Sequence, residues 1–125
     1  MAKNINLTEA EEKLANLIWR EGTLTSPELV ELGGLELGWK KSTTYTILKK
    51  LCDKGVLKNE KAQVSALLTR DEQMARQSKY YIEDAFGGSL PRFVASFFRG
   101  GNLSPEEVSE LRQLIDEYDE GKQND

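Results

Sequence analysis

The stretch KKSTTYTILKKLCDKGVLKNEKAQVSALL, residues 40–68, contains the pattern on which the fold assignment depends. Residues 41–54 carry apolar side chains at helical spacing, and Gly55 follows them where a glycine commonly ends a helix. Two short strand-like runs come next, residues 56–60 and 64–68, separated by a polar tip. Because so small a hairpin is only marginally stable alone, we expect it to pack against helices.

Two further helices are predicted before this stretch. The capping box TEAE at residues 8–11 opens the first, and Gly22 ends it. The motif SPE at residues 26–28 supplies an N-cap and a proline in the first turn of the second helix, which we expect the glycine pair at residues 33–34 to break. Three short helices followed by a two-stranded wing predict a winged helix-turn-helix.

Three amphipathic helices are predicted in the rest of the chain. Capping boxes at residues 69–72 and 104–107 open the first and the last of them. The motif SLP at residues 89–91 opens the middle helix, which is rich in phenylalanine. A glycine pair ends each of the first two helices.

The change of pattern near residue 69 is the predicted domain boundary. Residues 1–69 are expected to form the winged helix and residues 70–125 a helical region whose end, after Glu120, frays. A chain of 125 residues is long enough for one well-cored domain with an appended helical element. The expected fold class is therefore mainly α.

The composition excludes several classes of protein. The chain has no histidine and one cysteine, Cys52, so we expect neither a metal site nor an internal disulfide. We also expect no cofactor and no enzymatic activity, and we interpret Cys52 as a packed, small apolar side chain. The sequence has no long apolar run and no secretory signal, so we expect a cytoplasmic protein.

Charge is distributed unevenly along the chain. The net charge is -4, yet residues 39–61 hold seven lysines and two acidic residues, whereas residues 70–125 hold seven basic and twelve acidic residues. Since phosphate binding depends on clustered lysine and arginine, the first segment fits a nucleic-acid surface on an otherwise acidic chain.

We expect the helix at residues 41–54 to lie in the major groove of DNA, with hydrogen-bonding side chains at the base edges and lysines at the phosphates. Ser42 and the residues three, four and seven positions later share one face, and the opposite side is expected to turn toward the core with Thr44, Ile47, Leu48 and Leu51. An ordinary solvated helix face is the alternative, and the basic wing tip counts against it. The predicted DNA-binding residues are Trp39, Lys40, Lys41, Ser42, Thr43, Tyr45, Thr46, Lys49, Lys50, Lys58 and Lys61.

The apolar stripes of the three C-terminal helices need a partner, since large exposed apolar patches are uncommon on monomers. A three-helix bundle folded onto its own N-terminal domain is one solution. We favour a homodimer, because a helix-turn-helix commonly reads a two-fold symmetric operator as a dimer. The predicted dimerisation residues are Met74, Tyr81, Phe86, Leu90, Phe93, Val94, Phe97, Phe98, Val108, Leu111, Leu114 and Ile115.

The chain resembles the penicillinase repressor family (BlaI/MecI) over nearly its whole length, from Leu7 to Tyr118. Each motif that carries the resemblance is weak alone, but their order and spacing together are specific. The motifs are LTEAE at residues 7–11 followed by Ile18-Trp19, WKKSTTYTILKKL at residues 39–51 with Lys54-Gly55, FGGSL at residues 86–90, and LSPEEVSELR at residues 103–112.

The resemblance implies a homodimeric winged-helix repressor of a β-lactam resistance or cell-wall-stress operon, with double-stranded operator DNA as its partner. In this family a membrane sensor detects a β-lactam, and the repressor is then cut within its C-terminal dimerisation region. The Asn-Phe cleavage position of the family corresponds to Ser96-Phe97, which makes this pair the candidate cleavage site. The wing lacks the Gly-Arg and aromatic pattern of well-known members, and the chain lacks the cysteine cluster of copper-responsive relatives.

Two other functions stay open beside the repressor. A ligand-responsive repressor would use the aromatic C-terminal helices to line a small-molecule pocket. A protein-interaction module would have lost DNA binding and would dock a partner through its acidic C-terminal half. Catalysis is the least expected class, because the sequence offers neither a histidine base nor a phosphate-binding loop.

Overall fold

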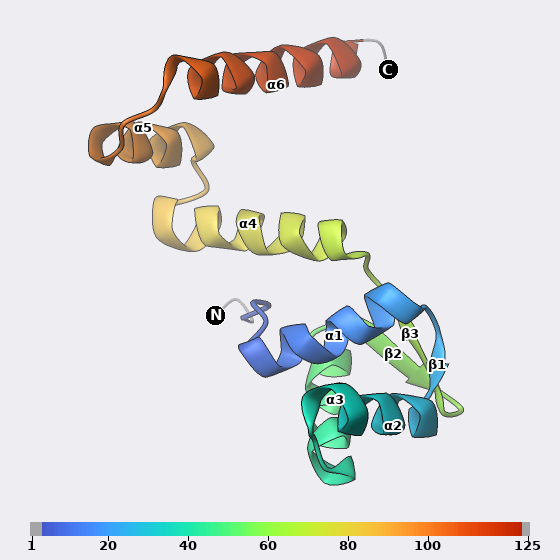
Figure 1. The fold of residues 1–125 in the computed structure, drawn as a ribbon. Helices are drawn as coiled ribbons and strands as arrows, with labels where there is room; N and C mark the ends of the chain where they lie inside the picture. The colour runs from blue at the N-terminus through green and yellow to red at the C-terminus, as the bar shows by residue number, and fades with distance from the viewer. Residues whose placement is uncertain (1–3, 124–125) are drawn as a thin grey trace. The chain divides into compact units, whose positions relative to one another are not determined.

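The computed structural model describes residues 4–123 as six helices and three short strands (Figure 1). They divide into two compact units, the first ending at Tyr81 and the second beginning at Ile82. In chain order the elements are α1 (Glu9–Glu21), β1 (Leu24–Thr25), α2 (Ser26–Leu37), α3 (Lys41–Asp53), β2 (Leu57–Glu60), β3 (Gln63–Ala66), α4 (Arg70–Phe86), α5 (Leu90–Gly100) and α6 (Pro105–Gln123).

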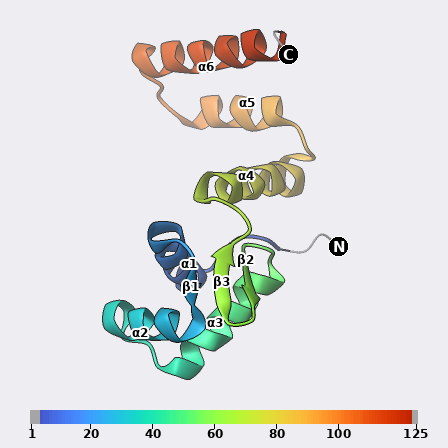
Figure 2. The same ribbon diagram turned by 90° about the vertical axis from the view of Figure 1, so that its right-hand side faces the viewer.

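The first unit is a winged helix, in which α1, α2 and α3 pack together beside a small antiparallel sheet (Figures 1 and 2). The mainly α fold class is therefore confirmed. The strand order is β1-β3-β2, so a third strand of two residues, β1, pairs with β3 beside the two predicted strands of the wing. The buried core residues of this unit are Leu14, Ala15, Leu17, Ile18, Leu29, Leu48, Leu51, Val56, Leu57 and Val64.

All three predicted capping boxes open their helices as expected. Thr8 caps α1 and Thr69 opens α4, and in each case the carboxylate of the glutamate three residues later accepts a hydrogen bond from the backbone N–H of the threonine. Ser104 and Glu107 make the same pair of bonds at the start of α6. The cap of α2 was predicted one residue too late, because Thr25 and not Ser26 accepts the hydrogen bond from the backbone of Glu28.

The expectation that the glycine pair at residues 33–34 breaks α2 is wrong. The helix continues to Leu37 and ends at Gly38, whose φ of +70° is the left-handed conformation that glycine tolerates best. Gly33 is needed for packing instead, since a Cβ there would lie 3.0 Å from the hydroxyl oxygen of Thr44. Its missing side chain lets α2 approach α3 closely.

The C-terminal helices form where they were predicted, with two differences at the ends. Helix α6 continues past Glu120 to Gln123, so three of the residues expected to fray are helical here, while residues 124–125 lie outside the described residues. Helix α4 begins at Arg70, where the helical region was expected to start, but its residues up to Tyr81 belong to the first unit. The functional boundary at residue 69 stays a prediction.

Glu11 is a buried charge in the first unit, with only 1% of its surface exposed. Lys54 Nζ donates to Glu11 Oε1 at 2.6 Å, and the backbone N–H of Thr8 donates to the same oxygen at 2.8 Å. Burial raises the pKa of Glu11, but the hydrogen bonds from Lys54 and Thr8 outweigh it and leave the pKa lowered. The pair therefore ties the start of α1 to the end of α3.

We expect Glu11→Gln to destabilise the protein by about 3 kcal/mol near neutral pH, the lower end for a broken buried pair, because Lys54 stays partly solvated. Glutamine still completes a capping box, so the loss reports the ion pair. Because the folded-state pKa of Glu11 is lowered, its contribution is complete above the ordinary pKa of about 4.3 and disappears as the pH falls through the lowered value. Urea unfolding from about pH 7 to about pH 2 measures both effects.

The matched control is Glu12→Gln, which removes the same charge from the next, exposed position of α1. We expect it to change the free energy of unfolding by less than about 0.5 kcal/mol. Equal losses in the two variants, or a gap between Glu11→Gln and the unchanged protein that persists at low pH, would contradict the assignment.

Candidate nucleic-acid interface

Helix α3 presents two contrasting faces. Thr44, Leu48 and Leu51 are buried and hold the helix in the core, as predicted from their spacing. Ile47, also expected on this side, is partly buried against the same core. The predicted base-contacting and phosphate-contacting residues of α3 are all exposed: Lys41, Ser42, Thr43, Tyr45, Thr46, Lys49 and Lys50.

The side chains at the start of α3 are partly ordered by local contacts. The Thr46 hydroxyl donates to the Ser42 carbonyl at 2.9 Å, so it remains free to accept a hydrogen bond from a ligand. Lys41 Nζ lies 6.0 Å from the centre of the Tyr45 ring, at the outer limit of a cation–π contact. Both arrangements lie on the exposed surface.

Trp39 and Lys40 precede the helix in a short connection. Trp39 packs against the core and is only partly exposed, so its indole anchors the segment that leads from α2 into α3. Its backbone N–H donates to the carbonyl of Gly33 at 3.3 Å. Lys40 is the exposed N-cap residue of α3 and makes no side-chain cap hydrogen bond.

Five lysines of the basic segment have no ion pair within residues 4–123: Lys40, Lys41, Lys49 and Lys50 at α3, and Lys61 at the wing tip. Lys54 and Lys58 differ, since Lys54 pairs with buried Glu11 and Lys58 Nζ lies 3.6 Å from a carboxylate oxygen of Glu60. The positive surface is therefore narrower than the sequence count suggests. It is concentrated on α3 and its N-cap.

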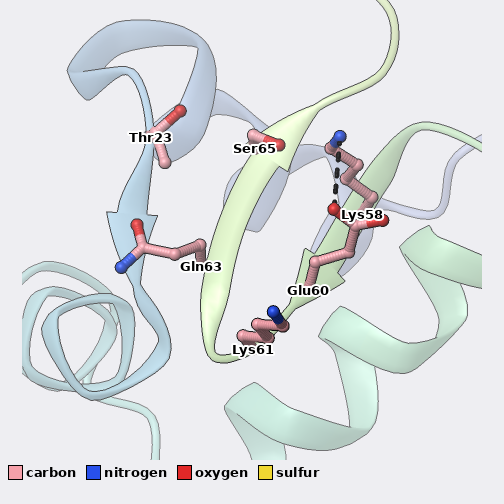
Figure 3. Close-up of a pocket in the computed structure, with 6 residues that line it drawn as sticks. All are labelled: Thr23, Lys58, Glu60, Lys61, Gln63 and Ser65. Carbon is pink, nitrogen blue, oxygen red and sulfur yellow. Dashed lines mark ion pairs between the residues drawn. The ribbon is translucent and has the colours of Figure 1, made fainter.

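The outer face of the wing forms an open groove (Figure 3). In Figure 3, Lys61 lies at the turn of the hairpin and the ammonium of Lys58 points to Glu60. Lys61 and Ala62 form the two-residue turn between β2 and β3, both with positive φ. Lys61 thus projects from the wing tip, whereas the charge of Lys58 is shared with Glu60. The groove is lined by Thr23, Lys58, Glu60, Lys61, Gln63 and Ser65.

The predicted dimerisation residues are largely uncovered in the single chain. No side chain from Ile82 to Gly121 is buried. Phe86, Phe93, Val94 and Val108 are half-buried, with the Phe86 and Phe93 rings edge to face at a centroid distance of 5.4 Å. The exposed members are Met74 (54%) and Tyr81 (50%) on α4, Leu90 (57%), Phe97 (53%) and Phe98 (49%) on α5, and Leu111 (40%), Leu114 (62%) and Ile115 (66%) on α6.

The candidate cleavage pair Ser96-Phe97 lies inside α5, and both residues are exposed. None of the described helices is long and apolar enough to cross a membrane. Residues 4–123 also hold no group of three side chains suited to bind a metal ion. Cys52 packs against the core, and burial, followed by the charge of Asp53, raises the pKa of its thiol.

Comparison with known proteins identifies relatives along nearly the whole chain. The sequence model of the penicillinase repressor family matches residues 7–117. The chain is 25% identical to a penicillinase repressor of Bacillus licheniformis over 94% of its own length and 95% of the relative. It is 24% identical to the methicillin resistance regulatory protein MecI of Staphylococcus aureus (strain N315), over 90% and 95% of the two lengths.

A third relative has no function in its name. It is an uncharacterized 16.5 kDa protein of Latilactobacillus sakei, 28% identical over 92% of this chain and 82% of the relative.

Proposed function

Because the chain belongs to the penicillinase repressor family, whose members are transcriptional repressors and not enzymes, we propose that it binds operator DNA as a homodimer in the cytoplasm. The exposed face of α3 is the observation that carries the proposal. This face combines hydroxyl side chains with lysines that have no acidic partner within the described residues.

The face of α3 has the chemistry that a major groove requires. The groove is about 12 Å wide and admits one helix, with its first turns at the base edges. Ser42, Thr43 and Thr46 supply donors and acceptors there, while the lysines on the flanks of α3 neutralise phosphates. Lys61 at the wing tip adds a contact to the neighbouring phosphates of the DNA backbone. Lys58 contributes less to phosphate binding, because Glu60 competes for its charge.

A dimer supplies the second DNA-binding unit. One winged helix alone binds weakly, and linking two copies raises the effective concentration of the second. The uncovered apolar side chains of α5 and α6 provide a surface for this association, since burial of that surface in a second copy removes it from water.

The names of the relatives indicate the process that is controlled. One is a penicillinase repressor and another a methicillin resistance regulatory protein, so we propose a β-lactam resistance or cell-wall-stress operon as the target. Repression would end when the C-terminal region is inactivated through a membrane sensor or its protease. A cut between Ser96 and Phe97 would divide α5 and its apolar face.

Titration of labelled genomic fragments, selected by binding to the full chain, tests the proposal. We expect two chains per two-fold symmetric site and an association constant whose logarithm falls linearly with the logarithm of the salt concentration. For about six phosphate contacts the slope would be about -5. An affinity that depends on neither salt nor sequence would exclude the proposed function.

A further inference from the structure

The start of α4 is fixed to the winged helix by a buried amide. Gln73 is 1% exposed, and its Nε2 donates to the carbonyl of Ile5 at 3.0 Å and to Gln77 Oε1 at 2.8 Å. A glutamine is rarely buried this completely in a small domain. The contact joins residues that are far apart in sequence, so it fixes α4 against the N-terminal segment.

Arg76, one turn further along α4, contacts the C-terminal end of α3, the helix proposed to enter the major groove. Its Nη2 donates to the carbonyl of Lys54 at 2.6 Å. Lys54 is the C-cap residue of α3, and a cation is favourable at the C-terminus of a helix because its last carbonyls are unpaired. A Cβ built on Gly55 would lie 3.5 Å from Arg76 Nη1, so the guanidinium lies directly against this turn.

The side chain of Lys54 completes the arrangement from the other side. Its Nζ donates to the carbonyl of Asn6 at 2.7 Å as well as to Glu11. The carbonyls of two consecutive residues, Ile5 and Asn6, are thus bound by α4 and by the end of α3 respectively. We call Lys54, Gln73 and Arg76 the α4 clasp.

We propose that Gln73 and Arg76 are positioning residues for operator binding, which fix the direction in which α4 leaves the winged helix and so set the spacing of half-sites that the dimer accepts. The inference rests on the proposed dimeric DNA binding. Neither side chain lies on the exposed face of α3, so neither is assigned a contact with DNA.

The physical reason lies in where the two functions are placed along the chain. The DNA-contacting residues all precede Ala62, whereas most of the proposed dimer residues follow Tyr81. The segment between them therefore decides whether two winged helices are held at one separation or move as on a flexible tether. A rigid connection favours one operator spacing, while a loose one accepts several with lower affinity for each.

The test uses the full chain and three synthetic duplexes derived from a selected operator: the native palindrome, a single half-site, and a palindrome lengthened by about 5 base pairs, which turns one half-site to the opposite face of the helix. The unchanged protein should prefer the native to the lengthened palindrome by roughly 100-fold. In Arg76→Ala and in Gln73→Ala we expect this ratio to fall below about tenfold, with half-site affinity within about twofold of the original.

Two further variants separate positioning from charge and from stability. Lys79→Ala removes the same charge from an exposed position of α4 and should keep the full spacing preference. Arg76→Lys retains a donor for the Lys54 carbonyl and should therefore keep part of the spacing preference that Arg76→Ala loses. Thermal melting identifies a variant that does not fold, in which case the other alanine variant decides.

The outcomes distinguish this inference from the function on which it rests. An unchanged spacing ratio in both folded alanine variants overturns the role of Gln73 and Arg76 alone. A loss of half-site affinity equal to the loss on the palindrome also overturns it, because the clasp would then only stabilise the winged helix. Failure of the unchanged protein to bind any of the duplexes overturns the proposed function itself.

Discussion

Replacing Lys40, Lys41, Lys49 and Lys50 together by glutamine should reduce operator affinity by roughly 100- to 1,000-fold at physiological salt while leaving the fold and the dimer intact. All four side chains are exposed, so the substitutions disturb no packing. None of the four has an ion pair within the described residues, so their charge is available to phosphate.

The salt dependence gives the sharper measurement. Each phosphate contact contributes about 0.9 to the slope of log affinity against log salt, so four lost contacts should lower its magnitude by up to about 3.6. The loss of affinity should be similar for operator and unrelated DNA, because phosphate contacts carry no sequence information. Fluorescence anisotropy with both duplexes at several salt concentrations measures the slope and the specificity ratio.

Two controls show whether position or net charge matters. Lys49→Gln with Lys50→Gln should weaken binding far more than Lys13→Gln with Lys79→Gln, although both pairs remove two charges. The fourfold change to arginine should keep binding, since the charge is retained. If all these variants bind DNA alike, the face of α3 is not the interface. If neither they nor the unchanged protein binds DNA, a protein-interaction module becomes the better interpretation.

Helix starts that a local capping box determines were mostly predictable, although the box at Thr25 was missed and α2 was placed one residue late. The capping boxes that begin at Thr8, Thr69 and Ser104 act within four residues, so the sequence alone contains the whole interaction. Gly33 failed as a predicted breaker because its role depends on Thr44 in another helix. The two-residue strand β1 has no periodicity to detect, since it exists only through pairing with β3.

The exposure of the α3 face was predictable from local spacing, whereas the ion pairs around it were not. Helical spacing alone places Ser42 and Lys49 on one exposed face. The ion pairs that remove Lys54 and Lys58 from the positive surface depend on the tertiary fold and on strand geometry. Gln73 was missed because its partner, the Ile5 carbonyl, is 68 residues away and no sequence pattern marks it.

Replacing Leu114 and Ile115 by glutamine should convert the proposed dimer into a monomer. These side chains are 62% and 66% exposed in the single chain, so a partner could cover about two thirds of each. Full burial of such a side chain contributes about 1.5–3 kcal/mol, and about two thirds of each is still exposed, so a two-fold dimer that loses four of them loses roughly 4–8 kcal/mol. That loss would raise the dissociation constant of the dimer by at least about 1,000-fold.

Glutamine keeps helix propensity and adds no charge, so a change in DNA binding would report association and not electrostatics. We expect affinity for the palindrome to fall by roughly 100-fold or more, to that of a single half-site, because the second winged helix is no longer linked to the first. Sedimentation velocity measures the mass, and Ser109→Gln on the polar side of α6 is the control that should remain dimeric. A double variant that still sediments as a dimer would place the interface elsewhere, since an apolar surface cannot lose its central side chains and keep its affinity.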